Sequence, residues 1–483
     1  MNFKQASYLN LSRDFYSKLS IKPFNNPTVI QWNFALTKEL EIPEGFGEDI
    51  LSFLKGKQSE YFKHVFAQAY AGHQFGNFTM LGDGRAIFLG EVVVQKQRFD
   101  LQLKGSGPTP YSRRGDGRAT LKAMTREYIM SEAMEALHIP TSRSLAVIST
   151  GESVFRTVPE PGAVLARVMK SHIRVGTFEY ARYFLDVEAL QSLLSYTVDR
   201  LYPSCKNAQN PALEFIKSVA TTQFELVANW MRVGFIHGVM NTDNTAISGE
   251  SFDYGPCAFM NQYNPQTVFS SIDTKGRYSF ENQGAIIQWN LVRLTESLLP
   301  LIDPSEAQAL VIAKSFIQGF EADWDRKYQQ MMAHKIGFSD ADKETERLIF
   351  DLLKRMEQQG ADYTNTFAGL CYSIPNTLSP WEQEAFLEWK NQWDSYASSK
   401  GITMEERIQL MRMNNPVVIP RNHLVESILA EIDQQAVNTE FSKRFHEAIS
   451  TWNNPYTYDE SLIPWMMPPT VDENQSHQTF CGT

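Results

Sequence analysis

Residues 234–255, GFIHGVMNTDNTAISGESFDYG, constrain the fold of this chain more than any other segment. They follow an apolar helical run and gather one His, two Asp and two Asn on loop-like sequence. Carboxylate and amide oxygens at this density are the groups that Mg²⁺ and a nucleotide phosphate require. We therefore interpret the segment as the active centre, which the rest of the chain must fold to present.

The first half of this segment, HGVMNTDN, runs from His237 to Asn244. It begins and ends like the H-G-D-x-x-x-x-N catalytic loop of small-molecule kinases, a variant of the protein-kinase H-R-D-x-x-x-x-N loop. The kinase base would stand two residues after the His, where this chain has Val239. Asp243 is then the only carboxylate in the loop placed to replace that base.

The second half contains Asp253-Tyr254-Gly255, which resembles the D-F-G motif whose Asp holds Mg²⁺. Between the halves, ISGES predicts a turn that folds its flanks into a hairpin and returns Asp253 towards Asn244. Either fragment alone is also compatible with a polar turn. Their order and closeness favour the functional interpretation.

A strand and a helix upstream predict a buried ion pair. RFDLQLKG alternates apolar and polar residues as a half-buried strand does, and Lys104 ends it on the side away from the core. Residues 119–137 are periodic as a helix, with Glu127 inside the apolar stripe and Glu132 and Glu135 further round towards solvent. Because a carboxylate in an apolar stripe is costly unless paired, we expect Lys104 to bind Glu127, as kinase-like sites require.

Glycine and arginine residues supply candidate phosphate contacts. Gly82-Asp83-Gly84 predicts a hairpin turn whose amides can approach a phosphate, and Arg85 follows it directly. Asp116 and Gly117 lie in a second loop, GSGPTPYSRRGDGRA, among three arginines that offer donors to an anion. A plain turn explains the same letters in the first loop.

A later strand-like segment, GAVLARVMKSHIRVGTFEYA, adds Arg167 and Arg174 as further candidate ligands of a nucleotide. The chain contains neither G-x-x-x-x-G-K-[ST] nor G-x-G-x-x-G, so a P-loop is excluded and a dinucleotide-binding fold has no support.

The order of these patterns predicts an α+β, protein-kinase-like fold with a β-rich small lobe and a helical large lobe. We expect an irregular N-terminal extension over 1–60, a small nucleotide-binding lobe over 61–177, a helical catalytic lobe over 178–455 and a tail over 456–483. Helical periodicity covers residues 187–201, 211–232, 283–299, 304–332, 341–358, 379–397 and 422–449.

Composition excludes several classes of protein. With 483 residues, 43% of them apolar, the chain can bury the cores of two or three domains. A net charge of −10 argues against a partner of duplex nucleic acid. An apolar run of about 18 residues and a signal-peptide core are both lacking, so we expect no membrane span, no secretion and a cytoplasmic location.

Taken together, the motifs resemble those of one family, the selenoprotein O family of protein adenylyltransferases. The similar stretches span about residues 70–470 and include GHQFG, LGDGRA, LQLKGSGPTPYSRRGDGRA, HGVMNTDN, DYGP, GRYSFENQ and NPVVIPRNHL. The resemblance implies a kinase-like fold that binds ATP in a flipped orientation. AMP is then transferred to a Ser, Thr or Tyr hydroxyl of a protein, and pyrophosphate is released.

The resemblance also implies roles for individual residues. Asp243 is similar to the family's proton acceptor, Asn244 and Asp253 to its Mg²⁺ or Mn²⁺ ligands, and Lys104, held by Glu127, to its phosphate-binding lysine. The remaining ATP contacts that match are Gly82, Gly84, Arg85, Asp116, Gly117, Arg167 and Arg174.

Cysteine usage bears on regulation. The four cysteines form no C-x-x-C pair, which argues against a zinc site. Cys481 occupies the place near the C-terminus where some family members carry selenocysteine, and an ordinary thiol there predicts weaker redox switching. Some relatives have a partner cysteine downstream of DYGP, where this chain has Ser270-Ser271, while Cys257 follows DYGP at once.

Three alternatives stay open on sequence alone: phosphoryl transfer by an atypical kinase, transfer of another nucleotide such as UMP with Mn²⁺, and a nucleotide-binding scaffold without activity. Val239, at the position of the kinase base, counts against the first. We expect a monomer whose partners are ATP and acceptor proteins.

Overall fold

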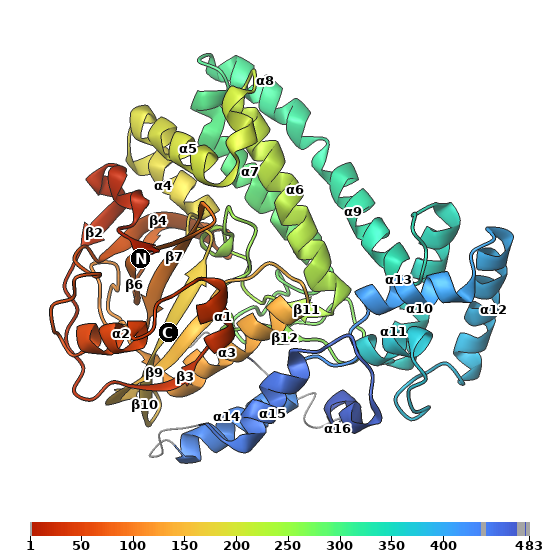
Figure 1. Cartoon of the computed structure of the whole chain (residues 1–483). Helices are drawn as coiled ribbons and strands as arrows, with labels where there is room; N and C mark the ends of the chain where they lie inside the picture. The colour runs from red at the N-terminus through yellow and green to blue at the C-terminus, as the bar shows by residue number, and fades with distance from the viewer. Residues whose placement is uncertain (1, 436–440, 471–478, 480–483) are drawn as a thin grey trace.

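A ten-stranded antiparallel sheet forms one side of the molecule (Figure 1). The computed structural model describes residues 2–435, 441–470 and 479. Strand order is β2-β4-β6-β7-β10-β9-β3, with β1 attached to β6, β5 to β4 and β8 to β10. The strands are β1 Phe3–Lys4, β2 Tyr16–Lys18, β3 Thr28–Trp32, β4 Phe66–Gln74, β5 Asn77–Gly82, β6 Ala86–Val94, β7 Gln97–Lys104, β8 Ala119–Thr120, β9 Arg143–Phe155 and β10 Pro159–Met169.

The first 60 residues form part of this sheet, which differs from the expected irregular extension. They contribute β1, β2 and β3 together with α1, Phe34–Glu39, and α2, Phe46–Leu54. Short apolar runs suggested loose wrapping, but Phe15, Ile50 and Leu54 are fully buried. Their burial explains why the segment is ordered on the sheet.

Strand β7 carries Lys104 at its end and is buried on both faces from Asp100 onward. Leu101 and Leu103 enter the apolar core beneath the sheet, as the alternation predicted. The polar face is also buried, because Gln102 accepts a hydrogen bond from Arg167 Nε at 2.8 Å and Lys104 meets acidic side chains. The prediction of a half-buried strand was wrong for that face.

Helix α3, Leu121–Ala136, packs against β9 and β10 on one side. On the other side it packs against α14, Asn422–Gln435, and α15, Lys443–Trp452. Such double-sided packing buries more than one stripe of the helix. Glu132 is therefore buried and bonded to Arg143, with Nη2 and Oε2 2.8 Å apart, contrary to its expected exposure. Glu127, predicted to face inward, is 4% exposed.

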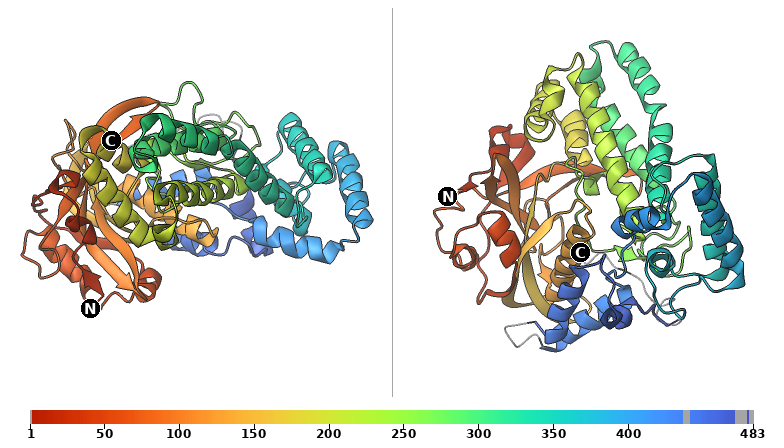
Figure 2. Two further views of the ribbon diagram at one scale, coloured as in Figure 1. Left: turned by 90° about the horizontal axis from the view of Figure 1, so that it is seen from above. Right: turned by 45° about the vertical axis from the view of Figure 1, so that its right-hand side comes forward.

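Most of the remaining helices form the other side of the molecule, so the fold is α+β and consistent with the two-lobed arrangement of a kinase-like protein (Figures 1 and 2). Figure 1 shows α14 and α15 returning below α3. The helices are α4 Val175–Phe184, α5 Val187–Leu201, α6 Pro211–Arg232, α7 Gln283–Ile302, α8 Glu306–Ile317, α9 Phe320–Lys335, α10 Lys343–Gln359, α11 Tyr363–Cys371, α12 Glu384–Ser399, α13 Met404–Asn414, α14 Asn422–Gln435, α15 Lys443–Trp452 and α16 Ile463–Met466.

Helix boundaries follow the sequence where caps are clear. α5 and α6 have the predicted bounds. Their starts are fixed by Asp186 and Asn210, which accept hydrogen bonds from the third backbone amide after each cap. The expected helix over 304–332 is divided at Gln318 and Gly319 into α8 and α9. Helices α1, α2, α4, α11, α13 and α16 were not predicted.

A two-stranded ribbon supports the loop between these parts. β11, Phe235–Ile236, pairs with β12, Ala258–Phe259. The hairpin predicted around ISGES does not form, because Ala246 pairs with Arg174 and Ser251 with Thr141. The backbone groups on both sides of ISGES thus pair with Arg174 and Thr141 rather than with each other. Pairing of β11 with β12 brings the two halves of the loop together.

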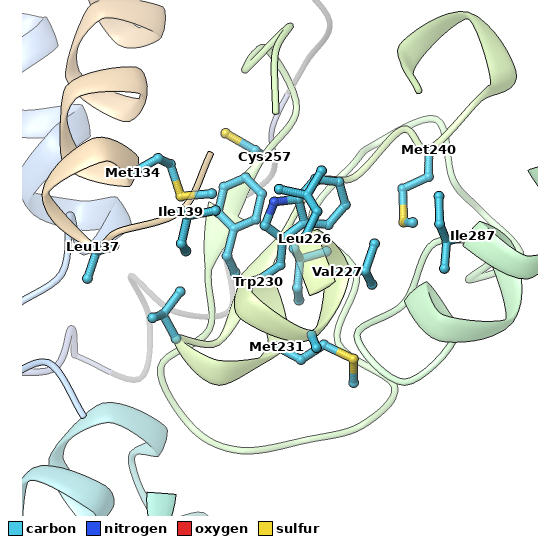
Figure 3. Close-up of a cluster of buried hydrophobic side chains, with 14 of the residues drawn as sticks. Met134, Leu137, Ile139, Leu226, Val227, Trp230, Met231, Met240, Cys257 and Ile287 are labelled. Carbon is cyan, nitrogen blue, oxygen red and sulfur yellow. The ribbon is translucent and has the colours of Figure 1, made fainter. Parts of the chain in front are cut away.

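A buried apolar cluster lies beneath the loop (Figure 3). It joins the C-terminal end of α3 and the chain just after it to one face of α6, with Met240 and Cys257 from the loop itself. Trp230 in this cluster donates its indole N–H to Ser251 Oγ at 2.7 Å. Burial of a side chain of this class contributes roughly 1.5–3 kcal/mol, so the loop rests on a rigid base. Among the described residues, no helix is both long and apolar enough to span a bilayer.

Candidate active site

A cleft of about 420 Å³ opens between the sheet and the loop over residues 234–255. Every candidate site residue lines it except Glu127, which lies behind Lys104. The candidates on its wall are Gly82, Gly84, Arg85, Lys104, Asp116, Gly117, Arg167, Arg174, Asp243, Asn244 and Asp253. Residues far apart in sequence thus share one cleft.

Lys104 is the centre of a buried charge cluster. Its Nζ contacts both Glu127 and Asp253, so the expected Lys104–Glu127 ion pair is confirmed. Arg167 Nη1 lies 2.7 Å from Asp253 Oδ1. Burial alone would raise the pKa of Asp253, but the charges of Lys104 and Arg167 hold it well below its usual range.

Asp253 has a left-handed backbone, with φ of +62°. Such a conformation is costly for a residue other than Gly and persists only where the surroundings enforce it. His237 provides one restraint, because its Nε2 donates to the Phe252 carbonyl at 3.0 Å. Burial lowers the pKa of His237, which keeps the ring neutral at pH 7. The His that begins HGVMNTDN therefore holds the backbone just before Asp253.

Asp243 lies in a short 3₁₀ turn, Thr242–Asn244, and is 8% exposed. Its Oδ2 accepts a long hydrogen bond of 3.3 Å from Gln74 Nε2, and its buried Oδ1 has no partner among the described residues. Burial raises the pKa of this carboxyl to about 6. Asp243 also packs on Gly72, where a Cβ would lie 2.7 Å from Oδ1. One carboxylate oxygen is thus buried at the cleft and uncommitted.

Arg174 comes from the residue before α4, since the strand-like segment that was expected to carry it ends at Met169. The guanidinium lies 4.0 Å from the ring centroid of Tyr70, and its Nη2 is 3.3 Å from Asp83 Oδ1. Its buried Nε and Nη1 have no hydrogen-bond partner among the described residues. Unpaired buried donors are costly, so the side chain is arranged to receive an anion.

Gly82 is the last residue of β5, and Gly84 and Arg85 lie on the link from β5 to β6. The hairpin predicted there is wrong, since both strands run antiparallel to β4 and the link bulges out between their pairings. The glycines are needed because Tyr111 covers the bulge. A Cβ on Gly82 would lie 2.3 Å from the Tyr111 ring, and one on Gly84 3.1 Å from the Tyr111 carbonyl oxygen.

Charged side chains of the second glycine loop are already paired with residues at the end of β9. Asp116 forms an ion pair of 2.9 Å with Arg156, and Arg118 contacts Glu152. Gly117 has φ of +67°, and a Cβ there would lie 2.2 Å from the Gly107 carbonyl oxygen. These residues shape the cleft wall, while Arg118 has a carboxylate partner already.

Asn244 and Asp253 offer the hard oxygen ligands that Mg²⁺ prefers. The Asn244 Nδ2 donates a hydrogen bond to the Val239 carbonyl at 3.0 Å, which fixes the orientation of the side-chain amide. Because this bond uses the nitrogen, the amide oxygen is left to act as a ligand. Asp253 Oδ1 already contacts Lys104 and Arg167, whereas the nearby Asp243 Oδ1 has no partner among the described residues. The residues present therefore fit a divalent cation that takes its other ligands from phosphate and water.

The sequence did not single out three residues that complete the site. Asp83, inside the Gly-Asp-Gly turn, is buried and orients Arg174, and a buried acid between two glycines would have been the only hint. Gln74 donates a hydrogen bond to Asp243, and the ring of Tyr70 packs against the Arg174 guanidinium. Neither residue lies in a sequence pattern typical of catalysis.

The thiols contribute little to the cleft. Cys257 is buried and points its Sγ at the Tyr254 carbonyl, and burial raises its pKa to about 12. Cys481 lies outside the described residues. Thr479 is described, and its Oγ1 donates to the Pro256 carbonyl at 2.6 Å while its backbone pairs with Ser270.

Comparisons with known proteins agree over nearly the whole chain. A family model described as "Protein adenylyltransferase SelO" matches residues 1–450. The protein nucleotidyltransferase YdiU of Bacillus mycoides is 45% identical over 482 residues, which cover 99% of this chain and 98% of the relative. Proteins of the same name from Bacillus cereus and Bacillus anthracis are each 45% identical, over 480 and 482 residues, and each match covers 99% of this chain and 97% of the relative.

Proposed function

The chain belongs to the SelO family of protein adenylyltransferases, and on that premise we propose that it transfers AMP from ATP to Ser, Thr or Tyr hydroxyls of proteins. The observation that carries this proposal is the cleft itself, which Asp243 and Arg174 both line. Among the described residues, the buried Asp243 Oδ1 and the buried Nε and Nη1 of Arg174 have no hydrogen-bond partner. A base and an anion site in one cavity are what nucleotidyl transfer to a hydroxyl requires.

The cationic side chains support binding of a triphosphate. Lys104, Arg167 and Arg174 come from β7, β10 and the start of α4, and all three are buried. Fixed charges in a cavity of low dielectric stabilise charge that develops during transfer better than mobile charges in water do. Asp253 and Glu127 hold Lys104 in place before ATP arrives.

Asp243 acts as the general base in the proposed reaction. It accepts the proton of the acceptor hydroxyl, the freed oxygen attacks the α-phosphorus, and the bond from that phosphorus to the bridging oxygen of pyrophosphate breaks. Pyrophosphate leaves with the bonding electron pair, and the proton remains on the Asp243 carboxyl. A Mg²⁺ or Mn²⁺ ion held by Asn244 and Asp253 would supply charge neutralisation to the phosphates.

Val239 distinguishes this reaction from kinase chemistry. The position of the usual kinase base is apolar and 6% exposed, whereas Asp243 is four residues later. The relatives are named for nucleotidyl transfer without naming the nucleotide, so transfer of UMP with Mn²⁺ is the second candidate. Competition of unlabelled UTP against labelled ATP separates the two.

Labelled ATP tests the proposal directly. The chain is incubated with Mg²⁺ and the proteins of a cell extract, in parallel with ATP labelled at the α- or the γ-phosphate. We expect protein-bound label from the α position only. Label from the γ position alone would establish phosphoryl transfer and overturn the proposal.

Two variants assign the residues. Asp243→Ala should reduce α-label transfer by roughly 10²–10⁴-fold, the scale for loss of a general base, while ATP binding persists. Lys104→Ala should weaken both binding and transfer, because its charge faces the phosphates in the ground state as well. Asp325→Ala on the exposed face of α9 is the matched control and should change neither.

A further inference from the structure

We propose that Thr242 and Glu179 are positioning residues that hold Asp243 in the orientation needed to accept the acceptor's proton. This inference rests on the proposed function and concerns a buried carboxylate, Glu179, that neither the motifs nor the mechanism above employ. Glu179 lies on α4, a helix absent from the sequence-based prediction, and its side chain is only 1% exposed. A buried carboxylate without a role would be costly, so its partners indicate what it does.

Both oxygens of Glu179 are engaged next to the catalytic turn. Oε1 lies 2.5 Å from His73 Nδ1, and Oε2 accepts a hydrogen bond of 2.5 Å from Thr242 Oγ1. Thr242 Oγ1 in turn accepts a bond of 2.7 Å from the His73 backbone amide. These three bonds form a closed ring that fixes the rotamer of Thr242, the residue directly before Asp243.

Asp243 needs such support because its own side chain is weakly held. The hydrogen bond that its Oδ2 accepts from Gln74 Nε2 is long at 3.3 Å, and Oδ1 has no partner among the described residues. The position of the carboxylate is therefore set by the backbone of the 3₁₀ turn. A base misplaced by about 1 Å can lose on the order of 10²-fold in rate, so fixing that backbone matters for transfer.

The start of α4 strengthens the same connection. The Val175 amide donates to the Thr245 carbonyl at 2.9 Å, on the other side of Asp243 from Thr242. Gly176 permits this approach, since a Cβ there would lie 2.0 Å from the Ala71 carbonyl oxygen and 3.4 Å from Asp243 Cα. α4 therefore contacts the catalytic turn on both sides of Asp243, at Thr242 and at Thr245. Among the described residues, Glu179 is the only buried acid of α4 that contacts this turn.

The test compares the effect of losing the Thr242 hydroxyl in two backgrounds. Thr242→Val keeps the shape of the side chain and removes the hydroxyl, whereas Thr242→Ser keeps the hydroxyl. With α-labelled ATP and extract proteins, we expect Thr242→Val to lower kcat about 10- to 100-fold with KM for ATP within about twofold, and Thr242→Ser to retain most activity. Thr197→Val, which removes an equally buried hydroxyl from α5, should leave kcat unchanged.

The second background carries Asp243→Ala. A residue that acts through Asp243 has nothing left to position there, so Thr242→Val should change the residual rate less than about twofold. An equal loss in both backgrounds, or no loss in the native background, overturns the inference. Should Thr242→Val fail to fold, Glu179→Gln is subjected to the same two-background comparison and the same criteria.

The same data separate this inference from the proposed function. If the native chain transfers no α-label to any protein, the proposed adenylyl transfer fails and the positioning role fails with it. If the native chain transfers α-label and the Thr242 and Glu179 variants behave like the Thr197 control, only the positioning role is refuted.

Discussion

Asp243→Asn should stabilise the folded protein at neutral pH, although it removes the proposed base. Burial raises the carboxyl pKa from 3.8 to about 6 in the folded chain. Because the folded-state pKa lies above the unfolded one, ionisation of this carboxyl lowers the free energy of unfolding as the pH rises from 3.8 to about 6. Below pH 3.8 the carboxyl is protonated in both states and this destabilisation vanishes. Two pKa units at 1.36 kcal/mol each correspond to about 3 kcal/mol at pH 8. At pH 5 roughly 1.5 kcal/mol remains, since the unfolded carboxyl is mostly ionised and the folded one still protonated.

Asparagine has nearly the same shape without the charge, so the variant should recover this cost. Taking unfolding as one transition with an entropy of about 2.1 cal/mol/K per residue, the melting temperature should rise by about 3 °C at pH 8 and about 1.5 °C at pH 5. Differential scanning calorimetry of both proteins at the two pH values measures the shifts. Asp325→Asn removes the same charge from an exposed position and should produce little change at either pH. Equal shifts at pH 5 and pH 8, or a destabilised Asp243→Asn, would show that the buried charge is not the cause.

Three further outcomes follow from the geometry. The rate of α-label transfer should fall about tenfold per pH unit below pH 6, because Asp243 must be unprotonated to accept a proton, and a rate constant that is flat between pH 5 and pH 8 would contradict this. Gly72→Ala would place a Cβ 2.7 Å from Asp243 Oδ1 and should lower kcat at least tenfold. The affinity for ATP, measured by isothermal titration calorimetry, should stay within about threefold of the native value. An unchanged kcat would show that Asp243 can shift freely. Glu127→Gln removes one of the two carboxylates at Lys104 and should weaken ATP binding about tenfold in the same calorimetric measurement. Glu135→Gln, on the exposed side of α3, is the control and should not weaken binding.

Local patterns predicted those parts of the fold whose signals lie within one element. Capped helices α5 and α6 have the predicted boundaries, and the Lys104–Glu127 ion pair followed from one strand and one helical stripe. The errors concern long-range pairing. The ISGES flanks had the composition of a hairpin, but Arg174 and Thr141 supply the partners for Ala246 and Ser251, and no local pattern encodes those partners.

Helix α4 was missed for a related reason. Its first turn, VGTF, contains a β-branched pair and a glycine, which lower intrinsic helix propensity. Tertiary contacts override that propensity, since the Val175 amide bonds the catalytic loop and Gly176 packs against β4. The sequence therefore identified Arg174 as a candidate ligand but assigned it to a strand, and it gave no reason to consider Glu179.

Asp243 and Asp253 line the same cleft, but their surroundings shift the pKa values of the two carboxyls in opposite directions. Both are largely buried, yet two cations hold the pKa of Asp253 well below its usual range, whereas burial raises that of Asp243 to about 6. A carboxyl that stays ionised suits a metal ligand, and one that titrates just below neutral pH suits a base that must take up a proton and release it in each cycle. Opposite pKa shifts in neighbouring carboxyls are the general signature by which such roles are assigned. Lys104 and Arg167 accordingly have two effects on the proposed chemistry. They line the cleft in which the triphosphate is proposed to bind, and their contacts with Asp253 leave Asp243 as the one acid of the pair that can change its charge near neutral pH.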